Sequence, residues 1–335
     1  MKWFYGRLLA IESSCDETAA ALLDGSRVLS NVVASQIEMH QKWGGVVPEA
    51  AARAHVEAII PVVSEALGGV VPDAVAVTNR PGLIGSLSVG VTAAKALSTV
   101  WNVPLVGVHH IEGHLLSPLA DRMDAFELFP YMALVVSGGH SELVLCECPG
   151  RYQLLAETLD DAAGEAFDKG ARLLGLGYPG GKAIQEAAIP GDPKKYSLPR
   201  SLPKDHAHFS FSGLKTAMLR LVEKEGSGID VASAAASLQA AIVDSLVPKA
   251  VEAMESRGLR RLALVGGVAA NVALRHALFH ECERRGAEFL VPPFDLCTDN
   301  AAMIGLAGSF RLAAGERDDF NMDVFARADL PGQMV

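Results

Sequence analysis

Two histidines one helical turn apart, and an aspartate far along the chain, are the residues best suited to chemistry. His110 and His114 are four residues apart, so on a helix their imidazoles share one face. Two imidazoles and one carboxylate form an open three-ligand site for a divalent metal such as iron or zinc. Asp299 is the candidate carboxylate, and an open coordination position would admit substrate or water. The alternative is that the chain's ten histidines include such a pair by chance.

A metalloprotease is the first rival interpretation of this histidine pair. In the zinc-protease motif His-Glu-x-x-His, the catalytic glutamate adjoins the first ligand. Here Glu112 follows His110 by two residues and lies about 200° around the helix, away from a metal-bound water. The spacing therefore disfavours proteolysis. Cys297 could add a fourth ligand, although a small buried residue is the commoner use of a cysteine.

The elements that must position these residues alternate between strands and helices, which predicts an α/β protein. A short apolar strand at Leu105–Val108 leads directly into the histidine helix. Gly266-Gly267 joins a predicted strand to a helix that starts near Asn271, as in a nucleotide-contacting turn or in any packed βα unit. The other predicted elements are a strand at 74–78 and helices at 51–67, 82–99, 162–174 and 232–255.

Two strand–turn–strand units, one opening each half of the chain, suggest a duplicated architecture. Leu8–Ile11 and Ala19–Leu23 flank a polar turn, and Met132–Ser137 and Ser141–Leu145 repeat that plan around Gly138-Gly139-His140. Turns of this kind can offer backbone N–H groups and hydroxyls to a phosphate or carboxylate. One similar pair could also be coincidence.

Composition identifies a folded globular protein of about two domains. The chain has 335 residues, 50% hydrophobic and 20% charged. Its apolar runs are too short for a membrane helix, and its first residues make a poor secretory signal, so we expect a cytoplasmic protein. Five cysteines without a Cys-x-x-Cys pair argue against a disulfide framework and a zinc ribbon.

The net charge of −10 disfavours tight unaided binding to nucleic acid, which depends on Lys and Arg meeting phosphates. One segment, Lys194–Arg220, is basic and rich in Pro and Ser. It is either an auxiliary nucleic-acid patch or a solvated loop. Its basic residues are Lys194, Lys195, Arg200, Lys204, Lys215 and Arg220, against the single acid Asp205.

Nine motifs in order span most of the chain, from Ile11 to Ile304. They are Ile11–Thr18, Gly44–Glu49, Val108–His114, Val136–His140, Asp160–Lys169, Tyr178–Gly181, Phe209–Thr216, Gly266–Asn271 and Cys297–Ile304. Taken together they resemble the bacterial TsaD family of tRNA adenosine threonylcarbamoyltransferases. So many motifs in one order are improbable by chance.

The resemblance implies the ASKHA (actin-like ATPase) fold, with two RNase H-like domains around a cleft. We expect the first domain at residues 1–120, completed by a C-terminal helix at about 300–325. The second is expected at 121–299, with a basic insertion near 190–220. The implied reaction moves the threonylcarbamoyl group of threonylcarbamoyl-AMP to N6 of the adenosine 3′ of the anticodon (position 37), releasing AMP. The tRNAs concerned read codons that begin with adenine.

The resemblance also implies roles for individual residues. The family's metal ligands fall on His110, His114 and Asp299, with iron favoured over zinc. Glu12 and Asp16 match a polar turn that faces the reacting end of the nucleotide, which makes Glu12 a candidate proton acceptor. The residues expected to contact the substrate are Val135, Val136, Ser137, Gly138, Gly139, Asp168, Gly181 and Asn271.

The chain departs from the family pattern at three positions. Arg80 stands where the family usually has glycine, and Lys182 follows Gly181 where proline is frequent. Gln185 replaces an aspartate that many members use as a further nucleotide contact. The roles of Arg80 and Gln185 are therefore open.

The resemblance further implies several partners besides tRNA. These are a TsaB-like ASKHA paralogue, a TsaE-like P-loop ATPase, and a separate enzyme that supplies threonylcarbamoyl-AMP. Two other functions stay open at this point. One is an ASKHA kinase or ATPase acting on a small molecule, and the other is a non-catalytic binding subunit, which should have lost the ligand set.

Overall fold

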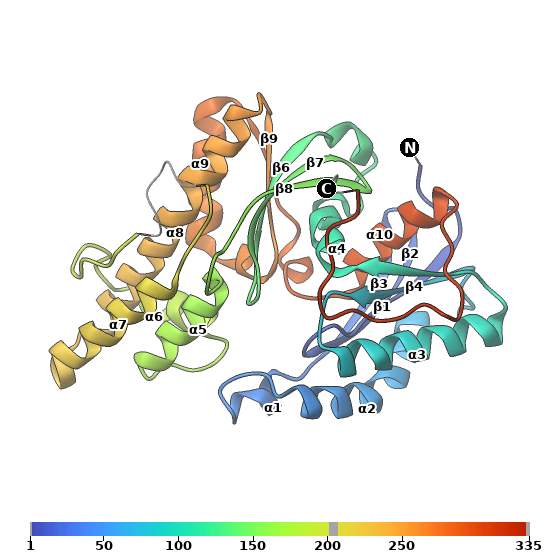
Figure 1. Cartoon of the computed structure of the whole chain (residues 1–335), viewed down its shortest axis with the longest axis horizontal. Helices are drawn as coiled ribbons and strands as arrows, with labels where there is room; N and C mark the ends of the chain where they lie inside the picture. The colour runs from blue at the N-terminus through green and yellow to red at the C-terminus, as the bar shows by residue number, and fades with distance from the viewer. Residues whose placement is uncertain (1, 201–206, 333–335) are drawn as a thin grey trace. The chain divides into compact units, whose positions relative to one another are not determined.

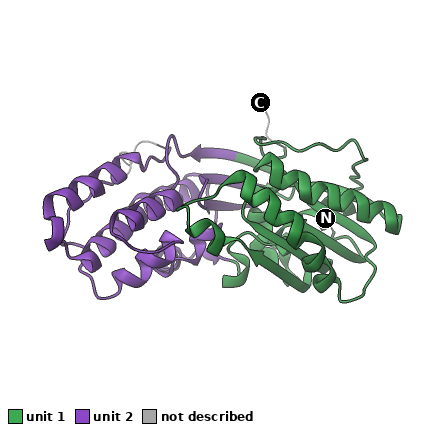
Figure 2. Cartoon of the chain, turned by 90° about the horizontal axis from the view of Figure 1, so that it is seen from below, with its two compact units in different colours: residues 1–129, 147–153, 292–335 green, residues 130–146, 154–291 purple. Residues whose placement is uncertain are grey.

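The computed structural model describes residues 2–200 and 207–332, which form two compact units (Figure 2). Unit 1 contains the described residues up to 129, residues 147–153, and those from 292 onward. Unit 2 contains residues 130–146 and 154–291. The two units therefore exchange at 129/130, 146/147, 153/154 and 291/292, and the domains 1–120 and 121–299 stay a prediction from the sequence.

Unit 1 is built on a five-stranded mixed sheet. Its order is β3-β2-β1-β4-β5, in which β1 to β3 are antiparallel neighbours and β4 and β5 run parallel to β1. Parallel neighbours need a crossover, and the intervening helices supply it. The strands are β1 (Arg7–Glu12), β2 (Glu17–Asp24), β3 (Arg27–Ser35), β4 (Ala74–Arg80) and β5 (Leu105–His109).

Helices cover both faces of this sheet, which is why β1 is apolar at successive positions rather than alternating. Leu9 and Ile11 pack in one cluster with residues of α2 and α3 such as Val63. On the other face, Gly305 and Gly308 let α10 approach the strands closely (Figure 1). The helices are α1 (Ile37–Gln41), α2 (Pro48–Leu67), α3 (Ile84–Trp101), α4 (His110–Leu116) and α10 (Ala301–Ala313), with short 3-10 turns η1 (Ser117–Leu119), η2 (Ala125–Leu128) and η5 (Phe294–Leu296).

The C-terminal helix is shorter than the sequence suggested, since it ends at Ala313 rather than near 325. Gly315 adopts a positive φ of 92°, a conformation that favours glycine and ends helices. Glu316 N then donates to the carbonyl of Arg311 at 3.0 Å. Residues 314–332, called here the C-terminal strap, continue as irregular backbone beside the first sheet (Figure 1).

Unit 2 repeats the plan of unit 1. Its sheet has the order β10-β9-β6-β7-β8, in which β6 pairs antiparallel with β7 and parallel with β9. Read from β8, this matches the order in unit 1, which confirms the duplication predicted from the two hairpins. The strands are β6 (Tyr131–Val136), β7 (Ser141–Cys148), β8 (Arg151–Glu157), β9 (Arg261–Val265) and β10 (Glu288–Leu290).

The long helix α8 (Val231–Ser256) packs against α5, α6 and α9 of unit 2. This helix is long and apolar enough to cross a membrane, but most of its apolar stretch is buried inside the unit, as in the core helix of a globular protein. The helices are α5 (Ala163–Leu173), α6 (Gly180–Ala188), α7 (Ser212–Glu225), α8 (Val231–Ser256) and α9 (Val272–Arg285), with 3-10 turns η3 (Gly226–Gly228) and η4 (Gly267–Ala270).

Candidate metal centre and substrate turns

The histidine helix α4 starts without a loop at the end of β5. His109 is both the last residue of β5 and the N-cap of α4, because its Nδ1 atom accepts a hydrogen bond from Ile111 N at 3.2 Å. Every residue of α4 is buried. The helix therefore holds His110 and His114 in a fixed direction relative to the sheet.

Unit 1 brings the two histidines and Asp299 together as the sequence predicted. Asp299 Oδ1 lies 3.1 Å from His114 Nε2 and 3.5 Å from His110 Nε2. The two imidazoles meet edge to face, with centroids 4.8 Å apart. One potential ligand atom from each of the three residues lies within 4.8 Å of the others, so the three could share one ion.

This donor set fits a divalent metal. Bonds of about 2.0–2.2 Å to imidazole nitrogen and carboxylate oxygen place neighbouring ligand atoms roughly 3.0–3.5 Å apart. The contacts of Asp299 Oδ1 to the two Nε2 atoms fall in that range. Two imidazoles and one carboxylate suit iron and zinc, and they leave coordination positions for a substrate.

Glu12 fixes the ring of His110 from behind. Its Oε2 atom lies 3.1 Å from His110 Nδ1 and accepts the hydroxyl of Thr78 at 2.5 Å, while Oε1 accepts Ser14 N at 2.5 Å. A carboxylate facing Nδ1 fixes the tautomer that leaves Nε2 as the ligand atom. The sequence suggested that Glu12 accepts a proton from substrate, but its side chain is fully buried.

The electrostatics of the centre follow from this packing. Burial alone would raise the pKa of Asp299, but the neighbouring histidines hold it well below its usual value, so Asp299 is a carboxylate. Burial lowers the pKa of His110, but Asp299 and Glu12 raise it well above its usual value. Burial keeps the pKa of His114 below its usual value, which favours the neutral ring.

Glu112 lies on the other side of α4, as its spacing predicted. Its carboxylate accepts the hydroxyl of Tyr152 at 3.2 Å and the guanidinium of Arg311 at 3.2 Å. Burial raises the pKa of Glu112, and Arg311 opposes that rise. This side chain anchors the helix and is directed away from the two histidines. Glu112 is therefore not placed to act as the general base of a metalloprotease.

Asp16 occupies the polar turn between β1 and β2, outside the histidine–carboxylate contacts. Its side chain is partly exposed, and its carbonyl accepts a hydrogen bond from Gln36 N at 3.1 Å. Of the two acids proposed for catalysis, only Glu12 touches a candidate metal ligand. Ser14 and Thr78 donate hydrogen bonds to the Glu12 carboxylate. The sequence alone did not assign them this role, because it depends on their proximity to Glu12 in the fold.

In unit 2, the turn between β6 and β7 is built around Ser137. Its hydroxyl accepts hydrogen bonds from Gly139 N at 3.3 Å and His140 N at 3.1 Å, and its backbone N donates to the His140 carbonyl at 2.8 Å. This is a serine-stabilised turn. Gly138 and Gly139 are exposed, with open space where a Cβ would stand, so their backbone is accessible to a ligand.

Two further glycines let neighbouring elements approach this turn. A Cβ on Gly164 would lie 2.5 Å from the carbonyl oxygen of Ser137, and one on Gly266 would lie 2.5 Å from that of Val136. Gly164 N also donates to the Ser137 carbonyl at 3.2 Å. The first turn of α5 and the end of β9 therefore support the predicted Val135–Gly139 segment from two sides.

Asp168 contacts the start of α6 at Gly180, the residue before Gly181. Asp168 Oδ1 accepts the backbone N–H of Gly180 at 2.8 Å, so this carboxylate satisfies one of the amides at the helix N-terminus. Gly181 follows with open space at its Cβ position. The structure thus places these two predicted substrate residues beside each other.

Asn271 caps α9, and the neighbouring amides engage it. Its Oδ1 atom accepts Leu274 N at 3.0 Å, and its Nδ2 atom donates to Gln239 Oε1 at 2.9 Å. Gln185 Oε1 accepts Val272 N at 2.7 Å. At this position, where the resemblance led us to expect an aspartate, the chain therefore uses a neutral amide to bind the N-terminus of α9.

Arg80, the other open departure, lies at the end of β4 and donates to Asn79 Oδ1 at 2.9 Å. Burial lowers its pKa, and the nearby Arg311 lowers it further. Its surroundings include Glu112, Glu316 and Asp318, whose charges oppose that change. Arg80 therefore belongs to the charged network behind α4.

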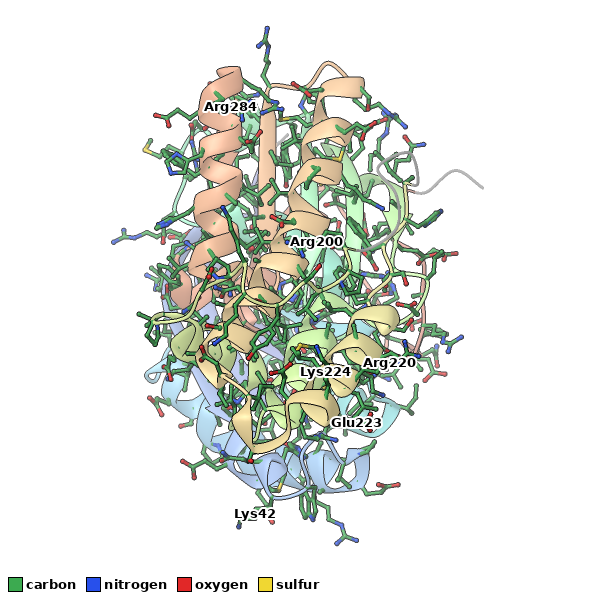
Figure 3. The ribbon with its side chains drawn as sticks, turned by 90° about the vertical axis from the view of Figure 1, so that its left-hand side faces the viewer. Lys42, Arg200, Arg220, Glu223, Lys224 and Arg284 are labelled. Atoms are coloured by element: carbon green, nitrogen blue, oxygen red, sulfur yellow. The ribbon has the colours of Figure 1, made fainter. Side chains whose placement is uncertain are left out.

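The basic segment is less free than its sequence suggested. Lys195 pairs with Asp230 at 2.8 Å and Arg200 with Asp244 at 2.6 Å, acids that lie outside the 194–220 window. Lys204 lies outside the described residues. Figure 3 labels Arg200 and, on α7, Arg220. Lys194, Lys215 and Arg220 are exposed, and the last two lie on α7.

Comparison with known proteins identifies close relatives. The sequence profile of the TsaD family, described as tRNA N6-adenosine threonylcarbamoyltransferase, matches residues 27–306. A protein of that name from Anaeromyxobacter dehalogenans (strain 2CP-C) is 54% identical over 330 residues, covering 95% of this chain and 98% of its own length. Another from Trichlorobacter lovleyi is 50% identical over 329 residues, covering 95% of each.

Solved structures support the fold. Full-length HypF, in its phosphate- and nucleotide-bound form, matches with a TM-score of 0.62 at 14% identity, covering 94% of this chain and 47% of HypF. The activator of 2-hydroxyisocaproyl-CoA dehydratase from Clostridium difficile matches with a TM-score of 0.54 at 12% identity, covering 92% and 96%. These similarities confirm the predicted ASKHA-type α/β fold.

Proposed function

The chain belongs to the TsaD family of tRNA N6-adenosine threonylcarbamoyltransferases, and we propose that His110, His114 and Asp299 hold the divalent metal of that activity. The transferase function predicted from the sequence is confirmed by near-full-length relatives at about half identity. The contact of one carboxylate oxygen with both histidines is the observation that carries the metal site. We favour iron, and zinc suits the same ligands.

The reaction we propose uses threonylcarbamoyl-AMP as the donor. The N6 amine of adenosine 37 attacks the carbamoyl carbon, an N–C bond forms, the C–O bond to the phosphate breaks, and AMP leaves with its electron pair. The proton of the amine passes to solvent or to AMP. Adenosine N6 is a weak nucleophile and AMP a good leaving group, so positioning and activation of the carbonyl matter more than a strong base.

Unit 1 supplies the activation. When bound, the cation provides a Lewis acid for the carbamoyl oxygen. His110 and His114 orient that site because α4 is buried on all sides, and Glu12 holds the ring of His110 through Nδ1. We therefore assign Glu12 as a positioning residue rather than as the proton acceptor. Asp16, more exposed in the adjoining turn, is retained as a candidate for contact with the reacting end.

Unit 2 supplies the donor-binding groups. The Ser137–Gly139 turn is proposed to hydrogen-bond the threonylcarbamoyl oxygens, because its glycines are exposed and its shape is fixed by Ser137. Val135 and Val136, at the end of β6 where the turn begins, are proposed to complete the contact with the donor. Asp168, Gly181 and Asn271 are proposed to bind the adenylate. An amide nitrogen carries two hydrogens, and Asn271 uses one of them on Gln239, so the second is the one assigned to the ribose.

Protein partners are proposed from the surface of unit 1. On α2, Val56 and Ile60 are one helical turn apart and 62% and 60% exposed, a pair of apolar side chains that a helical partner would cover. We propose a TsaB-like paralogue there, with a TsaE-like ATPase and an adenylate-forming enzyme completing a cytoplasmic pathway.

Because the chain carries a net charge of −10, we expect tRNA to bind the assembly better than it binds this chain alone.

The kinase alternative draws its support from the fold alone. Phosphoryl transfer does not require two histidines and a carboxylate around one position, and the ligand set that a pure binding subunit would have lost is intact. ATP-dependent phosphorylation of a small molecule without tRNA would favour that alternative. Metalloproteolysis is disfavoured because Glu112 is held by Arg311 and Tyr152.

The decisive experiment measures incorporation of labelled threonine into unmodified tRNA by this chain with generic partner proteins and an adenylate-forming enzyme. We expect label at the adenosine 3′ of the anticodon, and a loss of at least about a hundredfold in His110→Ala. His280→Ala is the matched control, since this exposed histidine lies on α9. Label retained in folded His110→Ala would remove the metal site from the mechanism, and no label with metal-loaded wild type would contradict the activity itself.

A further inference from the structure

The C-terminal strap covers the exposed edge of the first sheet. β5 is the edge strand in the order β3-β2-β1-β4-β5. Asp318 N donates to the Leu105 carbonyl at 2.8 Å, and Asp318 Oδ2 accepts Gly107 N at 2.7 Å. One aspartate therefore satisfies two backbone groups of β5 that an uncovered edge would leave to solvent.

Further contacts hold the middle of the strap against unit 1. Lys95 Nζ donates to the Met322 carbonyl at 2.6 Å, and the side chain of Met322 is 8% exposed in the core between the sheet and α3. Phe325 N donates to the Asn79 carbonyl at 3.0 Å, and Asn79 Nδ2 donates to the Asp323 carbonyl at 3.1 Å. Gly107 is needed for this fit, because a Cβ there would lie 2.7 Å from Met322 Sδ.

A later part of the strap reaches His109, the residue that caps the histidine helix. His109 Nε2 lies 3.1 Å from the carbonyl oxygen of Ala328, and His109 is 1% exposed. Because Nδ1 accepts the amide of Ile111, the proton of the neutral ring is on Nε2, which donates to Ala328. One imidazole thus joins the strap to the first turn of α4, directly beside His110.

We propose that His109 and the C-terminal strap position the metal helix, so that docking of the strap and binding of the divalent metal strengthen each other. The inference rests on the metal site proposed above. The strap fixes β5 through Leu105 and Gly107 and the start of α4 through His109, and the direction of His110 depends on both. Linkage is reciprocal: if the docked strap raises metal affinity, bound metal must stabilise the docked strap to the same degree.

The test uses Zn²⁺ as the probe, with its affinity measured by competition with a chelator. His109→Asn keeps an oxygen able to cap Ile111 N but is too short to reach Ala328. Asp318→Ala removes the strap contact to Gly107 at the other end. We expect each to weaken Zn²⁺ binding about tenfold, the lower end of the effect of residues that orient metal ligands. Asp319→Ala is the matched control, because its carboxylate accepts hydrogen bonds from Asn321 within the strap, and it should bind Zn²⁺ as wild type does.

Hydrogen exchange supplies a second readout that needs no substitution. In the wild-type chain, Zn²⁺ should slow exchange of the amides of Asp318 and Phe325, which lie in the strap and touch no candidate ligand. Unchanged exchange, or wild-type Zn²⁺ affinity in both folded variants, would overturn the coupling while leaving the metal site intact. Absence of Zn²⁺ and Fe²⁺ binding to the wild-type chain would instead overturn the metal site, and this inference with it.

Discussion

At the scale of single residues, the centre depends on how His110 is held from two sides. Its Nε2 atom faces Asp299, and its Nδ1 atom faces Glu12, which also accepts Thr78 and Ser14. All three neighbours of Glu12 present hydrogens to a buried carboxylate. If an amide replaces that carboxylate, its NH₂ group must face at least one of these three donors.

The first prediction follows from this geometry. Glu12→Gln places an amide NH₂ against groups that donate, so the ring of His110 should lose its fixed tautomer, and Zn²⁺ affinity should fall by about ten- to a hundredfold. Chelator competition measures the loss. Glu49→Gln, on the exposed first turn of α2, is the control. Unchanged affinity in folded Glu12→Gln would refute the positioning role.

A second prediction concerns protons at the same residue. Burial lowers the pKa of His110, but the carboxylates of Asp299 and Glu12 raise it well above its usual value. The metal-free ring is therefore protonated at neutral pH, and a metal must displace that proton. Zn²⁺ affinity should rise with pH from 6 to 8. Calorimetric titrations in two buffers of different ionisation enthalpy should show proton release, and equal heats in both would contradict the assignment.

At the scale of elements, close packing of backbones shapes the turn that we assign to the donor. Gly164 and Gly213 occupy equivalent positions, each the second residue of its helix. A Cβ on Gly164 would lie 2.5 Å from the Ser137 carbonyl oxygen, whereas a Cβ on Gly213 meets open space. The two glycines thus make a matched pair for substitution.

Gly164→Ala should destabilise the protein by about 1–3 kcal/mol, since the new methyl group must displace the Ser137 turn. Gly213→Ala should be neutral or stabilising by about 0.5–1 kcal/mol, because alanine restricts the unfolded chain. Thermal unfolding distinguishes them, and Gly164→Ala should in addition lower affinity for the donor. Equal melting temperatures would show that the turn and α5 are not in the close contact described.

Strand β7 offers a prediction on pH. Burial, aided by the charge of Glu157, raises the pKa of Glu142 from its ordinary value of 4.5 to about 7. A raised pKa means that the folded state holds a proton which the unfolded chain releases, so stability falls as pH rises from about 4.5 through 7. Glu142→Gln should therefore gain stability relative to wild type between pH 5 and pH 8, on the order of 1–3 kcal/mol. Denaturant unfolding at both values measures this gain, and a pH-independent difference would exclude it.

At the scale of the whole molecule, each unit repeats one topology, a hairpin and third strand followed by two parallel strands. The units have diverged in what they carry. Unit 1 holds the histidine–carboxylate set, and unit 2 holds the serine turn together with Asp168 and Asn271. Assembly with partner proteins involves the whole molecule, and a substitution on α2 of unit 1 tests the partner interface proposed there.

Ile60→Glu should abolish binding to a TsaB-like partner, because it places a charge in the centre of an apolar contact, and it should leave folding intact, since the side chain is 60% exposed. Ile189→Glu, on a still more exposed isoleucine of unit 2 (81%), should bind as wild type does. Size-exclusion chromatography of the mixed proteins reports the complex. Full binding by Ile60→Glu would move the interface away from α2.

The sequence by itself determined the elements whose pattern is local. The hairpins, the helix with His110 and His114, and the directions of the histidines and of Glu112 follow from periods of 2 and 3.6 residues, and the ordered motifs identified the family. The partly exposed β3 and β8 and the three-residue β10 were not predicted, because none of them has a marked apolar pattern. The C-terminal helix was predicted at the right start, near residue 300, but the prediction extended it to about 325, whereas the helix ends at Ala313.

Only the tertiary structure decided which distant groups meet. It buried Glu12 against His110, paired Gln185 with the N-terminus of α9, and brought Ala328 to His109. It also paired Lys195 with an acid outside the basic segment. Each of these depends on contacts between residues far apart in the chain, which local periodicity cannot specify, because the packing of whole elements sets them.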